Sequence, residues 1–460
     1  MNTTPGKRRH SRVPSGRFER LARIGWLAGE LAFGSAAARL RGGEGSGAQN
    51  WFFTGDNARR FARQLAGMRG AAMKLGQLLS LEGEDVLPPE VAAALAVLRS
   101  EGDAMPPEQL RRVLGRSYGR GWQRRFREFE FDPVAAASIG QVHRAVTSDG
   151  RELALKVQYP GVDRSIASDV DNLALALRLA RVLPVEIDLA NLLEEAKRQL
   201  RNEADYLAEA AHFSRYLALL ADEPAVVVPR VHADFSTAHV LAIDYLRGRP
   251  LEDLCGAEHA QERRDRAGEL LLRLALRELF EFRFMQTDPN FANYLFLAET
   301  DQIGLLDLGA AREIGKQTAE NYAALFRAAL ADDRAGLRRS ALALGFVASH
   351  HVRRRVDDVV ELLLLGTEPL RQAGIYDFGC SQVPARARAA GFETALRHGL
   401  VDPPPPEILL IQRKLGGVFL LCARLRARVD ARALVEAALS HYGTPLSRGR
   451  SKTPRAPTST

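Results

Sequence analysis

The sequence predicts an α+β fold, because strand patterns come first and helix patterns follow. Short apolar runs of strand length, separated by turn residues, occur between residues 134 and 157. Helical spacing of apolar residues dominates from Thr318 to Tyr442. Between these regions, the apolar runs Tyr294–Leu297 and Ile303–Leu306 flank a polar turn at Glu299–Gln302, which is the pattern of a β-hairpin.

The composition is that of a large globular protein and favours anionic partners. Its 460 residues suffice for two or three domains. A net charge of +8 and a sequence pI of about 9.6 suit nucleotide phosphates or lipid headgroups. Nucleic acid is the weakest candidate partner, because no RNA-binding aromatic motif, zinc finger or helix-turn-helix cue accompanies the charge. No run reaches the roughly 18 to 20 apolar residues that a membrane span needs.

The cysteines and the N-terminus indicate a reducing compartment without a secretory signal. The three cysteines are far apart and form no Cys-x-x-Cys, which argues against a disulfide framework or a zinc site. The N-terminus is basic at Lys7–Arg12, but no apolar signal core follows. An arginine-rich organelle-targeting peptide remains an alternative.

Two long helices are expected in the first quarter of the chain, and two shorter ones at Pro89–Leu98 and Pro107–Leu114. Phe18–Leu40 is amphipathic and rich in arginine, so it packs on the protein or lies on an acidic membrane surface. In Asp56–Leu81 apolar residues recur every four and three positions, which predicts a long helix. Lys74 and Gln77 lie on one face of this helix, beside the row of apolar residues. Taken alone, such side chains are most often solvated.

The next segment predicts strands around a phosphate-binding loop. Val134–Val146 and Glu152–Val157 have strand composition and are joined by a turn at Ser148–Gly150. Within the first run, A-x-A-x-x-G-x-V occupies the frame of the kinase loop G-x-G-x-x-G-x-V, with Ala135 and Ala137 in place of glycines. The candidate nucleotide-binding residues in this loop are Ala135, Ala136, Ala137, Ser138, Ile139, Gly140 and Gln141.

A lysine and a group of helix acids complete this part of the pattern. Lys156, in Ala-Leu-Lys-Val, follows the loop at the distance of the kinase strand lysine that contacts the phosphates. Such a lysine needs a helix glutamate to hold it, and the helical stretch Leu189–Leu219 contains Glu203, Asp205 and Glu209. As an alternative, these are three acids among many on a polar helix face.

A hinge between lobes is expected after the next strands. Val226–Val231 and His239–Tyr245 have strand composition. The segment Leu246–Pro250 contains glycine and proline and is expected to be an irregular connection between the lobes. The backbone of Asp244, Tyr245 and Leu246 is therefore the candidate contact for an adenine.

The strongest chemical signal stands around the predicted hairpin. Asp288 and Asn293 are five residues apart before it, and Asp307-Leu-Gly closes it. Protein kinases place a catalytic Asp, a metal-binding Asn and a second metal-binding Asp in this order. Either half alone is common turn chemistry, but the pair is much more specific. Asp377-Phe-Gly spells the metal motif literally, yet no hairpin precedes it, so we expect a loop there.

With these residues in place, the chain resembles the AarF/UbiB family of atypical kinases, in the branch that supports coenzyme Q synthesis. The resemblance runs from about Arg12 to Tyr442. It rests on family motifs that are highly specific together: K-x-G-Q at Lys74–Gln77, the Ala-rich loop at Ala135–Ser138, E-x-D at Glu203–Asp205, the Asp-Pro loop at Phe284–Asn290, and the block Arg413–Gly417. Leu308 stands where Phe is usual, and Asp244 where Glu is expected.

The resemblance implies a two-lobed protein-kinase-like fold with an N-terminal helical extension, whose K-x-G-Q helix folds over the active site. The expected segments are a disordered N-terminus (1–16), the helical extension (17–128), the N-lobe (129–245), the C-lobe (246–442) and a disordered tail (443–460).

The resemblance also implies roles for individual residues. Lys156 would contact the α- and β-phosphates, and Asp288 would be the catalytic Asp. Asn293 and Asp307 would bind Mg²⁺. We favour Glu209 as the partner of Lys156 and assign Glu203 with Asp205 to Lys74, although the sequence leaves that pairing open.

The function implied is an atypical kinase or ATPase that supports ubiquinone biosynthesis, with ATP or ADP and Mg²⁺ as cofactors. It would work peripherally on the anionic inner membrane from the cytoplasm, or alternatively on the mitochondrial matrix face. Its partners would be lipid quinone precursors or their enzymes, and a homodimer stays open. A nucleotide-gated scaffold is the main alternative. A small-molecule kinase of the aminoglycoside type ranks last, because it does not account for Lys74, Gln77 or the Ala-rich loop.

Overall fold

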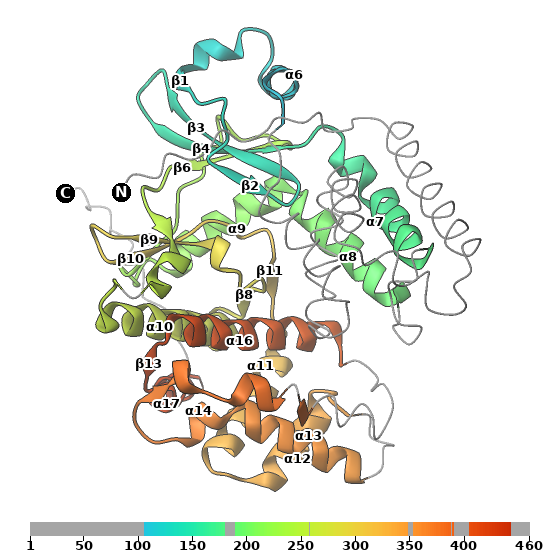
Figure 1. The fold of residues 1–460 in the computed structure, drawn as a ribbon, viewed down its shortest axis with the longest axis vertical. Coiled ribbons are helices and arrows are strands. Elements are labelled where there is room, and N and C mark those ends of the chain that lie inside the picture. Colours follow the sequence, from blue (N-terminus) through green and yellow to red (C-terminus); the bar gives the residue numbers. More distant parts are fainter. Residues whose placement is uncertain are drawn as a thin grey trace, which may run out of the picture. The chain divides into compact units, whose positions relative to one another are not determined.

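The computed structural model describes residues 105–179, 189–256, 258–347, 353–387, 389–390 and 404–442. The chain divides into two compact units (Figure 1). The first unit consists of residues 1–251 and 292–311, and the second of residues 252–291 and 312–460. The helices expected at Phe18–Leu40 and Asp56–Leu81, with Lys74 and Gln77, lie outside the described residues.

A five-stranded antiparallel sheet forms the centre of the first unit. Its order is β1-β3-β4-β6. Strand β1 pairs with the C-terminal part of β3, and β2 pairs with the N-terminal part. The strands are β1 (Phe126–Phe129), β2 (Ala135–Ala137), β3 (Gly140–Thr147), β4 (Glu152–Gln158) and β6 (Val240–Asp244). Helix α6 (Pro107–Tyr118) precedes the sheet, close to the predicted Pro107–Leu114.

The predicted strand Val134–Val146 is wrong in one respect, because a turn at Ser138-Ile139 divides it into β2 and β3. The two strands pair with Ala137 opposite Gly140. A Cβ at Gly140 would lie 2.3 Å from the carbonyl oxygen of Val157. Only glycine therefore allows the tip of this hairpin to lie so close to β4.

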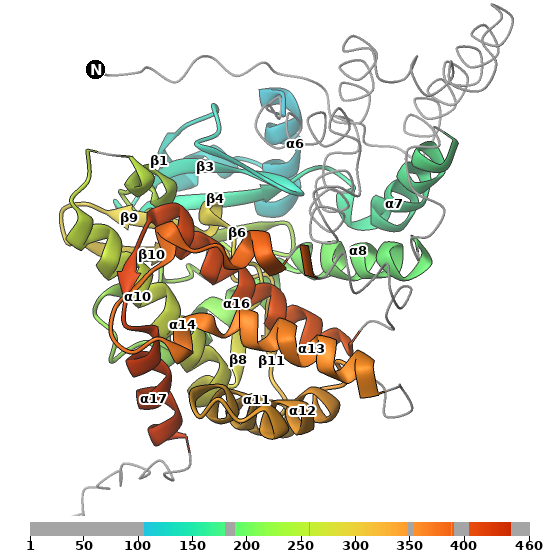
Figure 2. The same cartoon turned by 60° about the horizontal axis from the view of Figure 1, so that its bottom comes forward.

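The helices of the first unit are α7 (Val162–Leu179), α8 (Leu189–Glu203) and α9 (Tyr206–Leu219), and α7 packs along α8 (Figures 1 and 2). The single helix expected at Leu189–Leu219 is therefore two helices. The reason is local, because the Asp205 side chain accepts a hydrogen bond from the backbone N–H of Ala208 and so caps α9.

A second, four-stranded sheet in the first unit contains the predicted hairpin. Its order is β5-β10-β9-β7, with β5 (Val226–Val227), β7 (Arg249–Pro250), β9 (Tyr294–Leu297) and β10 (Gln302–Leu305). Strands β9 and β10 pair with Leu305 opposite Tyr294, which confirms the hairpin. The expected strand Val226–Val231 is wrong in extent, because β5 covers only its first two residues and pairs with β10, while Val231 forms an isolated bridge with Ile243 of β6.

The second unit is mainly helical, as predicted for the C-terminal half. Helix α16 packs against α10 (Figures 1 and 2), and α10 also contacts α17. The helices are α10 (Gln261–Leu276), the π-helical turn η4 (Arg277–Phe282), α11 (Lys316–Leu330), α12 (Arg334–Ala343), α13 (Arg353–Gly366), α14 (Glu368–Arg371), α16 (Pro406–Leu425) and α17 (Ala431–His441). Strand β8 (Phe284–Gln286) pairs with β11 (Ala311–Glu313), and β12 (Tyr376–Asp377) with β13 (Arg428–Val429).

The literal Asp377-Phe378-Gly379 motif is not the irregular loop that we expected. Asp377 ends β12, and a 3₁₀ turn follows at Phe378–Cys380. The side chain of Phe378 is fully buried, and Asp377 forms an ion pair with Arg428 at 3.2 Å. Burial of the aromatic ring and pairing of β12 with β13 give this segment its regular structure.

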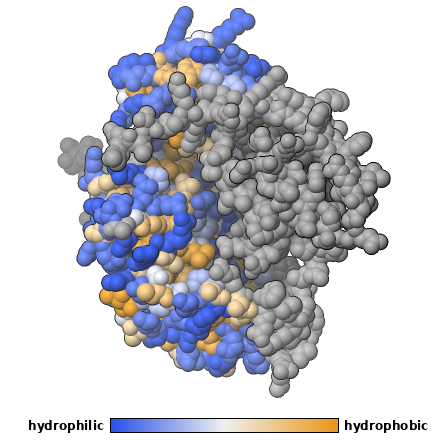
Figure 3. Space-filling view, in the orientation of Figure 1, coloured by the Kyte–Doolittle hydropathy of each residue, from blue (hydrophilic) through white to orange (hydrophobic). Residues whose placement is uncertain are grey.

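The surface and the helices have the distribution of polar groups expected of a globular chain. In the face shown in Figure 3, polar side chains cover much of the described surface, with apolar ones scattered between them. Among the helices that the structure describes, none is long and apolar enough to cross a membrane.

Candidate functional site

Lys156 lies at the centre of the candidate site in the first unit. It stands on β4 with its side chain nearly buried, and its Nζ lies 2.9 Å from both carboxylate oxygens of Glu209 on α9. Glu209 is fully buried. Of the acids that the sequence offered as partners, the structure thus brings Glu209 to Lys156, whereas Glu203 contacts Ser138 instead.

A second carboxylate completes the environment of Lys156. Its Nζ also donates to Oδ2 of Asp307 at 2.9 Å. Burial lowers the pKa of Lys156, but the carboxylates of Asp307 and Glu209 outweigh this effect and hold it well above its usual value. Burial raises the pKa of Glu209, although Lys156 opposes the shift. Lys156 is therefore a permanent cation between two acidic groups.

Helix α9 holds the Asp307-Leu308-Gly309 turn as well as the lysine. The Nδ1 of His212 donates to the carbonyl oxygen of Leu308 at 2.9 Å, and Oδ1 of Asp307 accepts from the Gly309 N–H at 3.0 Å. His212 follows Glu209 by three residues and so lies on the same helix face. Sequence reasoning missed His212, although this spacing is a signal that could have identified it.

The hairpin brings the two predicted metal ligands close together. The Leu306 N–H donates to the carbonyl oxygen of Asn293 at 2.9 Å, one residue before Asp307. Both residues offer the hard oxygen donors that Mg²⁺ prefers, and protein sites for Mg²⁺ often contain only one or two carboxylates, because phosphates complete the shell. In the described segments, no cluster of three or more His, Cys, Asp or Glu residues could hold a metal. The residues present fit a Mg²⁺ that is shared with phosphates.

The Ala-rich hairpin is tied to α8 through its turn. The Ser138 hydroxyl donates to the carboxylate of Glu203, the last residue of α8, while Ala135 and Ala136 are exposed. Ile139 and Gln141 are only 1% exposed. The Gln141 Oε1 accepts from the backbone N–H of Met105 at 2.8 Å. Any contact of Ile139 or Gln141 with a nucleotide would therefore come from backbone atoms.

Tyr206 is a further residue of this site that the sequence did not indicate. Its ring centroid lies 5.3 Å from Nζ of Lys156. Its hydroxyl is buried, faces Gly140 and has no hydrogen-bond partner within the described part of the chain. Its place directly after the E-x-D motif is the only sequence signal. Burial and the neighbouring carboxylates keep its pKa far above the usual value, so the hydroxyl remains a donor.

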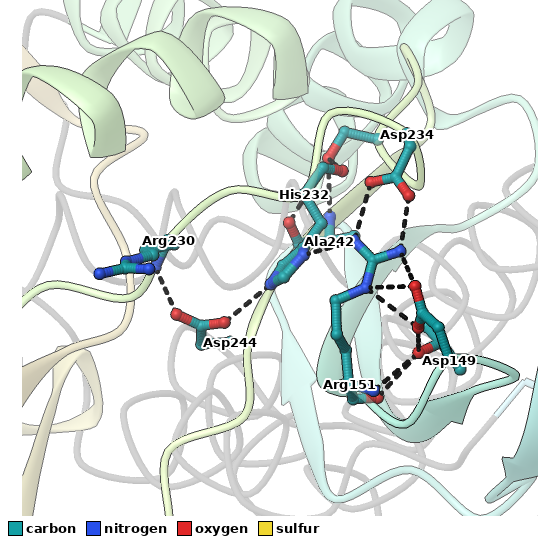
Figure 4. Close-up of polar contacts among 9 residues, drawn as sticks. Asp149, Arg151, Arg230, His232, Asp234, Ala242 and Asp244 are labelled. Atoms are coloured by element: carbon teal, nitrogen blue, oxygen red, sulfur yellow. Dashed lines mark hydrogen bonds and ion pairs between the residues drawn. The ribbon is translucent and has the colours of Figure 1, made fainter.

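The predicted hinge acid, Asp244, contacts the segment that precedes β6 (Figure 4). Its Oδ2 accepts from the Arg230 N–H at 2.9 Å and its Oδ1 from Nε2 of His232 at 2.7 Å. Arg151, which also pairs with Asp149 and Asp234, donates to Nδ1 of His232 at 3.0 Å. Because arginine only donates, Nδ1 of His232 accepts this hydrogen bond.

The rest of the hinge is held through the backbone. The Tyr245 N–H donates to the carbonyl oxygen of Glu152 at 3.0 Å. The Leu246 side chain lies against Gly304 of β10. A Cβ added to Gly304 would lie 2.7 Å from Cδ1 of Leu246. The Asp244 carboxylate is engaged by Arg230 and His232, so any contact of this residue with an adenine would come from its backbone.

Asp288 belongs to the second unit and follows the π-helical turn and β8. Its N–H donates to Oε1 of Gln286 at 2.8 Å, and its carbonyl oxygen accepts from the Asn290 N–H at 2.9 Å. Nη2 of Arg413 on α16 lies 2.6 Å from its carboxylate Oδ1. Sequence reasoning noted the block Arg413–Gly417 only as a family motif and gave Arg413 no role. A distance of 125 residues along the chain hides such a contact from sequence spacing.

Comparisons with known proteins give concordant matches. A model of the ABC1 atypical kinase-like domain matches residues 97–341. The mitochondrial atypical kinase COQ8B of Rattus norvegicus is 39% identical, over 94% of this chain and 82% of the relative. The mitochondrial atypical kinase COQ8 of Saccharomyces cerevisiae is 34% identical, over 92% of this chain and 85% of the relative. A solved structure, the Rv3197–erythromycin complex from Mycobacterium tuberculosis, is similar with a TM-score of 0.57 and 25% identity, over 85% of this chain and 97% of that chain.

Proposed function

This chain belongs to the ABC1, or AarF/UbiB, family of atypical kinases in its COQ8 branch, and on that premise we propose that it binds ATP or ADP with Mg²⁺ and turns ATP over in support of ubiquinone biosynthesis. The observation that carries the proposal is the contact of Lys156 with both Glu209 and Asp307. Kinases hold a strand lysine with a helix glutamate in this way and use it against the phosphates.

The main residues that the sequence pointed to have these roles in the proposal. Lys156 would bind the α- and β-phosphates, oriented by Glu209, and Asn293 with Asp307 would hold the metal. Bound Mg²⁺ supplies positive charge that offsets charge on the phosphates. Asp288 would face the accepting hydroxyl or water and take its proton. The backbone of the Ala-rich turn and the hinge would complete the nucleotide contacts.

We further propose that the protein acts peripherally on an anionic inner-membrane surface, from the cytoplasmic side or from a mitochondrial matrix side. The net charge of +8 supports attraction to such a surface. The molecules it serves would be lipid quinone precursors or the enzymes that modify them. Membrane binding should then weaken as salt is added, because exposed charges are screened.

The experiment is ATP hydrolysis by the full chain with Mg²⁺, with and without cardiolipin-containing liposomes. Asp307→Asn should abolish turnover, because it removes a metal-binding charge beside Lys156. Asp377→Asn is the matched control: it changes the literal Asp-Phe-Gly motif, whose Asp pairs with Arg428, and should leave turnover unchanged. Nucleotide binding without turnover under any condition would favour the scaffold alternative.

A further inference from the structure

The block Arg413–Gly417 on α16 contacts the loop that carries Asp288 at several points within the second unit. We propose that α16 positions Asp288, with Arg413 acting on its carboxylate directly and Lys414 and Gly417 acting on the loop backbone. This inference rests on the proposed function, in which Asp288 faces the accepting group. It gives positioning roles to three residues that the proposed mechanism does not otherwise use.

Arg413 supplies the positive charge next to Asp288. Nη2 of Arg413 lies 2.6 Å from Oδ1 of Asp288, and the two side chains are only 12% and 20% exposed. The segment from Asp288 to Asn293 contains no basic residue of its own. A charge-assisted contact of this length restricts the rotation of the carboxylate. The direction in which Asp288 faces is therefore determined by a helix far along the chain.

Lys414 acts through a buried sequence of polar contacts. Its Nζ lies 2.9 Å from Oε2 of Glu278 in the π-helical turn. Oε1 of Glu278 accepts from the Gln286 N–H at 3.3 Å. Oε1 of Gln286 in turn accepts from the Asp288 N–H at 2.8 Å. These contacts connect α16 to the backbone of Asp288 without passing through solvent, and π-helical turns are frequent at functional sites.

Gly417 lets α16 approach the proline that follows Asp288. A Cβ at Gly417 would lie 2.0 Å from Cγ and 2.6 Å from Cβ of Pro289. Gly417 is four residues after Arg413, so the two lie on one helix face. The same face thus contacts the carboxylate of Asp288 and the ring of Pro289. The neighbouring Gly416 differs, because a Cβ there would meet nothing within 4 Å.

The first test changes the charge. In the full chain, Arg413→Gln should lower kcat for Mg-ATP hydrolysis by about tenfold or more, because a small misplacement of a reacting group is costly. The Kd for Mg-ATP should stay within about twofold, because the phosphate-binding residues proposed here are untouched. Arg413→Lys should recover most of kcat. Arg432→Gln, which removes another arginine that pairs with a carboxylate, is the control and should match wild type.

The second test changes the shape of the α16 surface next to Pro289 without changing its charge. Gly417→Ala should reduce kcat with little change in the Kd for Mg-ATP, because the added methyl group displaces Pro289 and with it Asp288. Gly416→Ala should behave as wild type. The inference is overturned if wild type hydrolyses ATP and Asp288→Asn abolishes turnover while Arg413→Gln and Gly417→Ala retain the wild-type kcat. In that case the proposed function stands.

A third measurement decides the inference if no turnover is found at all and the proposed function fails. Asp288→Asn, Arg413→Gln and the double variant form a thermodynamic cycle in Tm. Non-additive shifts, in which Arg413→Gln lowers Tm less when Asp288 is already changed, would support control of Asp288 by Arg413. Additive shifts would overturn it.

Discussion

Nζ of Lys414 lies 2.9 Å from Oε2 of Glu278, and each side chain is only 1% exposed. The pair joins α16 to the π-helical turn that leads to Asp288. Removal of two charges from water is costly, so such a pair is weak evidence for stability by itself. Loss of one partner, however, leaves an uncompensated charge in the interior. The pair therefore makes the structure around Asp288 sensitive to single substitutions.

Lys414→Met should destabilise the protein by about 3 to 5 kcal/mol, because Glu278 is left as a buried charge without its cation. Chemical denaturation monitored by circular dichroism would measure this loss. Lys316→Met is the control, since the pair of Lys316 with Glu320 is exposed and should contribute no more than about 1 kcal/mol. Equal effects of the two substitutions would contradict the prediction.

Glu209→Gln should reduce nucleotide turnover by about 100-fold, the scale of removing one preorganised electrostatic group from an active site. Glu209 holds Lys156 through both carboxylate oxygens, whereas Glu203 contacts Ser138. Glu203→Gln should therefore have a clearly smaller effect on the same steady-state ATPase assay. A larger effect of Glu203→Gln would contradict the assignment of Glu209 as the functional partner of Lys156.

Ala137→Gly should alter the relative affinities for ADP and ATP, because it restores a flexible glycine at the tip of the Ala-rich hairpin. Ala137 pairs with Gly140 across the Ser138-Ile139 turn, and loss of its Cβ would loosen β2. Isothermal titration with both nucleotides tests this. Ala154→Gly on β4, outside the turn, is a control for general loosening of the sheet. Unchanged affinities in Ala137→Gly would count against the assignment of this hairpin to nucleotide binding.

The buried His143 should make stability depend on pH in the acid range. Burial lowers its pKa to about 4, and its ring contacts the Glu130 carbonyl oxygen and the Gln141 amide. Between the unfolded pKa near 6.5 and about 4, the unfolded chain binds more protons, so stability falls as pH falls. The loss should approach about 3 kcal/mol by pH 4.

Urea unfolding at several pH values would measure this dependence. His143→Gln removes the titrating group and should flatten the stability curve between pH 6.5 and 4, whatever its effect at pH 7. Parallel curves for wild type and His143→Gln would show that His143 does not carry the effect.

The sequence by itself determined the features that depend on neighbours along the chain. The hairpin at Tyr294–Leu305 follows from two short apolar runs around a polar turn. The choice of Lys156, Asp288, Asn293 and Asp307 as candidate site residues follows from motif spacing. The helical second half follows from apolar periodicity. Each of these signals is local, because backbone preference and side-chain spacing are set within a few residues.

Sequence reasoning was wrong where a break in regular structure has no strong residue signal. The turn at Ser138-Ile139 contains neither glycine nor proline, so Val134–Val146 looked like one strand. The break between α8 and α9 depends on Asp205, which caps α9. An aspartate within a helical apolar pattern does not show whether it will cap a helix or remain solvated.

Only the tertiary structure decided which charged groups meet. The sequence favoured Glu209 over Glu203 as the partner of Lys156 but left the pairing open, and the packing of α9 on the sheet brought Glu209 to it. Arg413 and Asp288 are 125 residues apart, and nothing in their spacing predicts their contact. An ion pair depends on the distance and direction of two side chains, and these follow from how whole elements pack. That is information a local pattern does not contain.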